Sequence, residues 1–316
     1  MIDDILSRLA HALSRFDART RSFDAGRAVL ALAQLTLLLT TPTNRVFVPV
    51  GTQLPFAKCD LFLREVSAFC WSEPEPVRWI FIVLLLAIGA GLAPRYLSWV
   101  HWYIALSIGM AIDLPEGGEA ILMTATFWIA IASIADPRWL AWRDPSRPPS
   151  PVLNAVAWAA LWILRIQMAY IYLNSGIAKL AVEQWGDGSA LYYVVRMEFF
   201  GSVGPLGDLA RFLTSVPLFA AALTWGTIAL EIAMAVLILG PVKMQRYALA
   251  ASIALHLAIA VLLGLASFAL AMVGAMLCAT AAASAHLSAL RRTTSGAPDH
   301  DPQADSNVGL VHTLRQ

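Results

Sequence analysis

Three polar residues share one face of a long apolar stretch. Arg165, Tyr172 and Lys179 are spaced by seven in LRIQMAYIYLNSGIAKLAVEQWGDG, residues 164–188. On an α-helix this spacing keeps the three side chains within about 40° of one another. A charge at the centre of a bilayer costs at least about 2.5 kcal/mol, so the polar face should turn toward the interior of a helix bundle.

Lys179 allows two interpretations. A lysine near the end of a spanning helix can snorkel, with its ammonium in the headgroup region. Here, however, small residues surround Lys179, and QWGDG follows with Trp185 and two glycines suited to a tight turn. Burial favours the neutral amine, which can act as a base, so we predict that Lys179 lines an outward-opening pocket near Tyr172 and Trp185. His256 is either part of that pocket wall or a hydrogen-bonded core histidine.

Arg165 calls for a structural interpretation, because arginine keeps its proton. It lies about 21 Å below Lys179 on a helix that rises 1.5 Å per residue. A later apolar run descends from Pro217, so Glu231 should reach a similar depth. We predict a buried ion pair between Arg165 and Glu231, since each charge would offset the other inside the membrane.

The elements that must position these residues are membrane spans. Of 316 residues, 59% are hydrophobic and 14% charged, whereas soluble domains are about 25% charged. The net charge of +1 gives no basic field, which excludes a nucleic-acid partner and leaves membrane lipid as the surroundings. About eight runs are apolar and long enough to span a bilayer as helices. They lie near 27–41, 77–93, 98–112, 119–135, 153–180, 217–240, 245–263 and 267–290.

These runs predict an all-α integral membrane protein with both termini on one side. The segments that would then share the side of the termini hold the larger share of Lys and Arg, which predicts an N-in, C-in topology in a cell membrane. Residues 1–26 are predicted to be an interfacial amphipathic segment, because IDDILSRLAHALSRF places apolar residues at helical spacing with Asp and Arg between them. Residues 27–290 form the transmembrane domain, and 291–316 are polar and predicted to be a disordered cytoplasmic tail.

The cysteines and the acidic residues add two expectations. Cys59 and Cys70 share the first outer loop, where they are either disulfide-bonded in an oxidising compartment or free thiols, and we predict the bond. The loop DLPEGGE places Asp113, Glu116 and Glu119 together without His or Cys. We expect these carboxylates to be solvated, and we predict no metal site.

The residues from 164 onward resemble a known family. LRIQMAYIYLNSGIAKL with the Trp and Gly that follow, then Glu231 and His256, is similar to the horizontally transferred transmembrane (HTTM) domain, the membrane half of vitamin K-dependent gamma-carboxylases. In that family a lysine at the position of Lys179 deprotonates reduced vitamin K. The resemblance therefore implies an HTTM-type bundle, a reduced quinone of the vitamin K or menaquinol type as cofactor, Lys179 and His256 as catalytic residues, and Tyr172 and Trp185 at the quinone.

Other stretches resemble a narrower group, the sporulation-delaying protein B family of small bacterial membrane proteins. They are FDARTRSFDAGRAVLALAQLTLLLT, PRYLSWVHWY, GGEA, DPRWLAW and the Cys59/Cys70 loop. This resemblance implies a multi-pass protein of the bacterial cytoplasmic membrane that works with a soluble partner to mature a secreted antimicrobial peptide. A non-catalytic scaffold or immunity protein is the alternative. A transporter is less favoured, since no repeat symmetry is evident.

Overall fold

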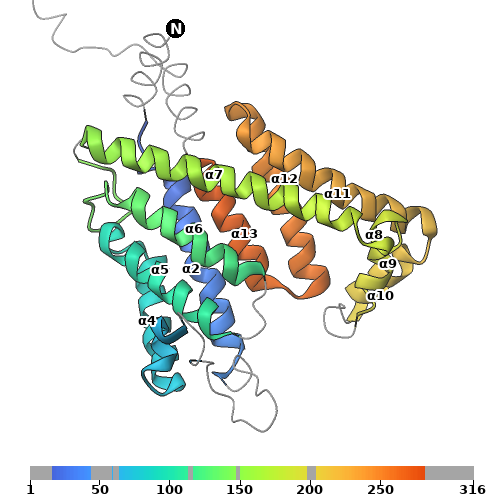
Figure 1. Ribbon diagram of the computed structural model, residues 1–316, viewed down its shortest axis with the longest axis horizontal. Coiled ribbons are helices and arrows are strands. Elements are labelled where there is room, and N and C mark those ends of the chain that lie inside the picture. Colours follow the sequence, from blue (N-terminus) through green and yellow to red (C-terminus); the bar gives the residue numbers. More distant parts are fainter. Residues whose placement is uncertain are drawn as a thin grey trace, which may run out of the picture.

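The computed structural model describes residues 16–43, 59, 64–112, 117–146, 150–197 and 204–281, and these residues form helices joined by loops (Figure 1). The longer helices are α2 (Arg21–Thr40), α4 (Pro74–Gly89), α5 (Pro94–Ala111), α6 (Gly117–Ser133), α7 (Pro151–Leu180), α11 (Pro217–Leu239), α12 (Val242–Leu263) and α13 (Ala266–Ala279). The shorter ones are η1 (Arg64–Val66), η2 (Ala68–Cys70), α8 (Glu183–Gly186), α9 (Ala190–Val194) and α10 (Gly204–Thr214).

Each of the eight predicted apolar runs is occupied by a helix. Four of them, α2, α7, α11 and α12, are long and apolar enough to cross a membrane, and α6 and α13 are shorter apolar helices. The protein is therefore all-helical with several helices suited to a bilayer, while the count of eight spans and the N-in, C-in topology stay predictions. The helix α2 begins at Arg21, inside the segment 1–26 that we predicted as interfacial. Residues 1–15, 282–290 and the tail 291–316 lie outside the described residues.

Local sequence explains where these helices begin and end. The helices α4, α5, α7 and α11 each start at a proline, whose fixed φ suits the first turn and whose missing N–H has no partner there in any case. The helix α2 starts after Thr20, whose hydroxyl accepts a hydrogen bond from the amide of Phe23 at 3.2 Å. The helix α12 ends at Leu263 and is capped by Gly264, which has a φ of +73° that favours glycine.

The tightest packing joins α2 to α13. A Cβ added at Gly26 would lie 2.5 Å from the Cys278 sulfur, and one added at Gly274 would lie 2.7 Å from Leu30 Cγ. Glycine at both positions lets the two helix backbones approach closely. The main buried core gathers around this pair with side chains from α6, α7 and α11, and a second core lies between α2, α4 and α5.

Several loops that are far apart in the sequence meet at one end of the bundle. The Trp142 indole donates to the carbonyl of Ala90 at 2.9 Å, and the Asn154 amide donates to the carbonyl of Phe16 at 2.7 Å. The segments before α2, between α4 and α5, and between α6 and α7 therefore share this end. The prediction assigned these same segments to one side of the membrane.

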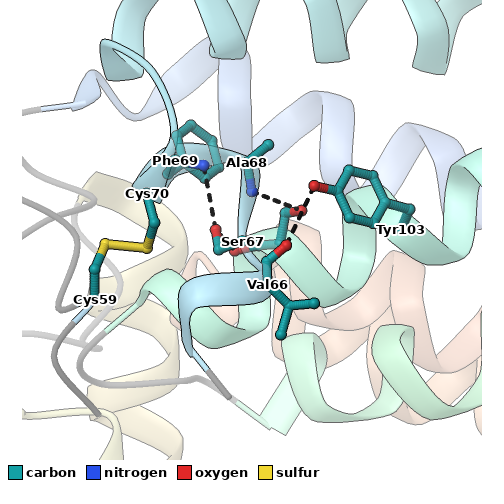
Figure 2. The surroundings of a disulfide bond; sticks show 8 residues. Cys59, Val66, Ser67, Ala68, Phe69, Cys70 and Tyr103 are labelled. Atoms are coloured by element: carbon teal, nitrogen blue, oxygen red, sulfur yellow. Dashed lines mark hydrogen bonds between the residues drawn. A yellow bond between two sulfur atoms is a disulfide. The ribbon is translucent and has the colours of Figure 1, made fainter. Parts of the chain in front are cut away.

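The opposite end carries a disulfide (Figure 2). Cys59 and Cys70 are bonded, and their Cα atoms are 5.7 Å apart, within the reach that the prediction required. Ser67, at the start of η2, donates to the carbonyl of Ser107 at 2.8 Å, and the Tyr103 hydroxyl donates to the carbonyl of Val66 at 3.2 Å. These contacts fasten the segment before α4 to the helix α5. That this disulfide lies outside the cytoplasm stays a prediction.

Glu119 differs from the expectation for the acidic loop. Its side chain belongs to the first turn of α6 and is buried, with 4% of the residue exposed, rather than solvated. Asp113 and Glu116 lie outside the described residues.

Candidate functional site

Lys179 and Glu231 form an ion pair between α7 and α11. The Lys179 ammonium lies 2.7 Å from Glu231 Oε2 and 2.9 Å from Oε1, and it also donates to Ser175 Oγ at 2.6 Å. The Ser175 hydroxyl in turn donates to Glu231 Oε1 at 3.2 Å. The side chain of Lys179 is 21% exposed and that of Glu231 9% exposed. This is a compact charged group in a largely apolar setting.

Close packing of the two helices brings the pair together. Gly176 faces α11, where a Cβ would lie 2.9 Å from Ile232 Cγ1 and 3.6 Å from Glu231 Cβ. With hydrogen as its side chain, Gly176 lets the backbone of α7 come near the residues around Glu231. Because Ser175 and Lys179 are one helical turn apart, both side chains reach the same carboxylate.

The predicted pair of Arg165 with Glu231 is wrong. That prediction assumed that α11 starts level with the end of α7. Arg165, counted back from the end of α7, and Glu231, counted forward from the start of α11, would then lie at the same depth in the membrane. Instead the first half of α11 extends past the end of α7 and packs on the short helices between them. The amide of Leu191 in α9 donates to Thr224 Oγ1 at 3.2 Å, and a Cβ on Gly188 would lie 3.1 Å from Ala221. Glu231 is therefore level with Lys179.

The contacts of Lys179 are those of a charged ammonium. Its three N–H groups can be used by the two oxygens of Glu231 and by Ser175, and its Nζ lies 5.2 Å from the centre of the Trp185 ring. A base role requires that the ammonium proton first pass to another group, and the Glu231 oxygens at 2.7 and 2.9 Å are acceptors in reach.

Tyr172 and His256 meet in the core rather than in a pocket with Lys179. The Tyr172 hydroxyl and Ser252 Oγ are 2.8 Å apart, and His256 Nδ1 lies 2.8 Å from the carbonyl of Ser252. Both residues are buried, at 1% and 2% exposure. A carbonyl accepts, so we assign the proton to Nδ1, which makes Nε2 the acceptor nitrogen of the ring. The bond between Tyr172 and Ser252 thus joins α7 to α12, and the His256 ring lies beside Tyr172, with the ring centres 6.0 Å apart.

These contacts do not fit a reduced quinone in the way that we predicted. The Tyr172 hydroxyl is taken by Ser252, and the donors of Lys179 are taken by Glu231 and Ser175. Trp185 stacks on the lysine. The polar side chains that we predicted beside the quinone are thus satisfied by the protein, and this arrangement does not fit that cofactor.

Arg165 lies apart from this group, near the end of the bundle where the loops meet. Its Nε donates to the carbonyl of Ala279 at 3.0 Å, at the C-terminal end of α13, and its guanidinium lies 4.5 Å from the Trp162 ring centre. The residue is 5% exposed. The negative end of the α13 dipole partly offsets the charge.

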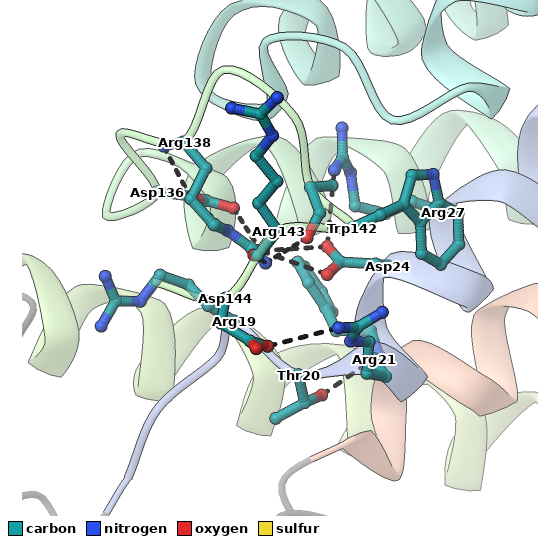
Figure 3. A network of polar contacts seen from close by, with 12 residues as sticks. Arg19, Thr20, Arg21, Asp24, Arg27, Asp136, Arg138, Trp142, Arg143 and Asp144 are labelled. Carbon is teal, nitrogen blue, oxygen red and sulfur yellow. Dashed lines mark hydrogen bonds and ion pairs between the residues drawn. The ribbon is translucent and has the colours of Figure 1, made fainter. Parts of the chain in front are cut away.

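A buried charge cluster at the start of α2 was not predicted (Figure 3). Arg138 Nη2 lies 3.2 Å from Asp24 and 2.7 Å from Asp136, and Arg27 Nη1 lies 3.9 Å from Asp24. Burial alone would lower the pKa of Arg138, but the hydrogen bonds and charges of Asp136 and Asp24 outweigh it and raise that pKa. Asp24 belongs to FDARTRSFDAGR and Arg138 to DPRWLAW, so two stretches that resemble the narrower family meet here.

Long apolar helices with charges buried between them define an all-helical membrane protein. Two curated proteins of Bacillus subtilis (strain 168) are similar to this chain along most of its length. An uncharacterized protein, YitO, is 28% identical over 282 residues, covering 86% of this chain and 90% of that protein. Sporulation-delaying protein SdpB is 26% identical over 282 residues, covering 86% of this chain and 85% of that protein. The similarity supports an SdpB-like family. No family model and no solved structure matches the chain.

Proposed function

We propose that this protein is a membrane component of a system that matures a secreted peptide of the sporulation-delaying type. The observation that carries the proposal is the similarity to sporulation-delaying protein SdpB over 86% of the chain. Similarity over most of both chains supports a shared architecture rather than a shared motif. The helices suited to a membrane agree with this role.

Within this function we assign the Lys179–Glu231 pair as the reactive group. It is a carboxylate and an ammonium in direct contact, and Lys179 keeps some exposure while Glu231 is buried. Transfer of the ammonium proton to Glu231 would give a neutral amine, which can then remove a proton from an acidic group of a peptide or small ligand. Arginine in place of Lys179 would keep the ion pair but would not give up its proton.

The test is to express the chain with its genomic neighbours and to measure the mass and the amount of the secreted peptide. Deletion of the chain should abolish the mature peptide, and a peptide of unchanged mass and amount would refute the proposal. Lys179→Ala and Lys179→Arg should both stop maturation, whereas Lys243→Ala, which removes an exposed lysine at the start of α12, should not. Normal maturation in Lys179→Arg would exclude a base role for Lys179 but not the role of the protein in maturation. The pair with Glu231 would then be structural.

A second function, a non-catalytic scaffold or immunity protein, is favoured by one observation. The polar groups of Lys179, Tyr172 and His256 already have partners inside the protein. Cells that lack the chain would then still secrete the mature peptide but would be killed by it. Survival counts after adding purified peptide to cells with and without the chain distinguish this function from maturation.

A further inference from the structure

A cavity opens beside Arg165, at the end of the bundle where the loops meet. Its volume is about 290 Å³, and it lies between α7 and the turn that joins α11 to α12. Aromatic walls come from Phe16, Trp158 and Trp162, and the turn contributes Gly240 and Pro241. Lys179 and Glu231 do not line it, so this cavity is separate from the pair to which we assign the chemistry.

Arg165 brings to this cavity a positive charge that no described carboxylate pairs with. The side chain makes one hydrogen bond, from Nε to the carbonyl of Ala279, and stacks on Trp162. Within the described ranges no carboxylate pairs with it, and neither of its two Nη groups donates a hydrogen bond to a described residue. A buried cation that lacks an anion is costly, and these free N–H groups have the fork geometry that binds carboxylates and phosphates.

The cavity has a second feature suited to an anion. The helix α12 begins at its wall, with Pro241 as cap and Val242 as first residue, so the positive end of a 22-residue helix faces the same space. Gln245, 5% exposed, also lines the cavity, and its side-chain nitrogen donates to the carbonyl of Gly240 at 2.8 Å. Its buried oxygen Oε1 has no hydrogen-bond partner in the described part of the chain. That oxygen can accept from a ligand hydroxyl.

We propose that this cavity is a binding site for the phosphate group of an amphiphile that also carries a hydroxyl. The phosphate would lie between the Arg165 guanidinium and the first amides of α12, and the hydroxyl would donate to Gln245 Oε1. Phe16, Trp158 and Trp162 would cover the apolar part. A membrane lipid with a glycerol phosphate headgroup has this chemistry, and a soluble phosphorylated compound shares its polar half.

The first experiment compares lipids on the purified full chain in detergent micelles. Phosphatidylglycerol and phosphatidylcholine with the same acyl chains are titrated, and binding is followed by native mass spectrometry and by the rise in melting temperature. Phosphatidylglycerol should bind more tightly to the wild type. Equal binding of the two lipids would overturn the proposal. Competition by glycerol phosphate at concentrations comparable to those of the lipid would support the phosphate site and assign it to a soluble ligand.

Two variants locate the binding. Arg165→Gln should weaken phosphatidylglycerol binding about tenfold or more, since it removes charge-assisted hydrogen bonds. Arg246→Gln is the matched control, because Arg246 is an exposed arginine on the first turns of the same α12 helix, and it should bind as the wild type does. Wild-type binding by Arg165→Gln would overturn the proposal. A photoreactive phosphatidylglycerol on the unmodified chain should label the peptides around Trp158 and Gln245, and labelling confined to other segments would also refute it.

Discussion

Arg138 and Arg165 are both deeply buried, yet their surroundings differ in one respect. Arg138, with 7% of its side chain exposed, lies between the carboxylates of Asp24 and Asp136. Arg165, 5% exposed, has a carbonyl and an indole ring but no carboxylate among the described residues. The first charge is balanced by the protein, and the second leaves room for an anion from outside. The presence of carboxylate partners, rather than the degree of burial, thus distinguishes a structural cation from a cation that can bind a ligand.

The largest expected effect comes from unbalancing the cluster of Arg138. Asp24→Ala removes the carboxylate shared with Arg27 and leaves two buried guanidinium groups short of a partner. We expect a loss of about 3–5 kcal/mol in the free energy of unfolding, measured by unfolding with SDS in mixed micelles. The control is Asp144→Ala, which breaks the exposed pair with Arg21 and should cost about 1 kcal/mol or less. Equal losses of stability in the two variants would contradict the difference between the buried cluster and the exposed pair.

Glu231→Gln should have the next largest effect. It leaves the Lys179 ammonium with a neutral amide, and because Lys179 is partly exposed we expect a loss of about 2–3 kcal/mol, below that of a fully buried pair. The double variant Glu231→Gln with Lys179→Met should recover part of that loss, since no charge then remains unpaired. Additive losses in the same unfolding assay would show that the pair does not couple.

Gly26→Ala tests whether close helix packing holds the cluster in place. A Cβ there would meet Cys278 Sγ at 2.5 Å and backbone atoms of α13 at 2.9 Å, so the helices must separate, at about 1–3 kcal/mol. Gly226 on α11 has nothing within 4 Å of its added Cβ, and Gly226→Ala is the matched control. It should be neutral or slightly stabilising, because alanine favours helix. A tolerated Gly26→Ala would mean that the contact of α2 with α13 is looser than described.

Arg165→Met should have the smallest effect on stability. The variant loses one hydrogen bond to Ala279 but also removes a buried charge that no carboxylate of the described residues offsets. These two effects oppose each other, so we expect the free energy of unfolding to change by about 1 kcal/mol or less. Arg138→Met should cost more, because it leaves the carboxylates of Asp24 and Asp136 without this cation. Melting temperatures of both variants in lipid-free detergent provide the comparison. A large loss for Arg165→Met would indicate a structural role.

The helices could be predicted from the sequence because each apolar run signals its own element. The ion-pair partners of charged residues could not be predicted in the same way, because they depend on how far one helix is shifted along its neighbour. Glu231 was assigned to Arg165 because the residues between α7 and α11 were treated as a simple return, whereas α8, α9 and α10 lengthen that connection and let α11 begin beyond the end of α7. The contact of Asp24 with Arg138 spans 114 positions and leaves no local pattern.

The packing of α2 against α13 has a consequence for the biosynthesis of the protein. Ser267 donates to the carbonyl of Ala33 at 2.9 Å across 234 positions of sequence, so α2 leaves the ribosome long before its main partner exists. At about 5–20 residues per second, this delay is roughly 10–50 s. During that time Asp24 and Arg27 must be kept from lipid by the translocation machinery or by water at the membrane surface. Assembly of the bundle therefore includes a late step in which α13 docks against α2.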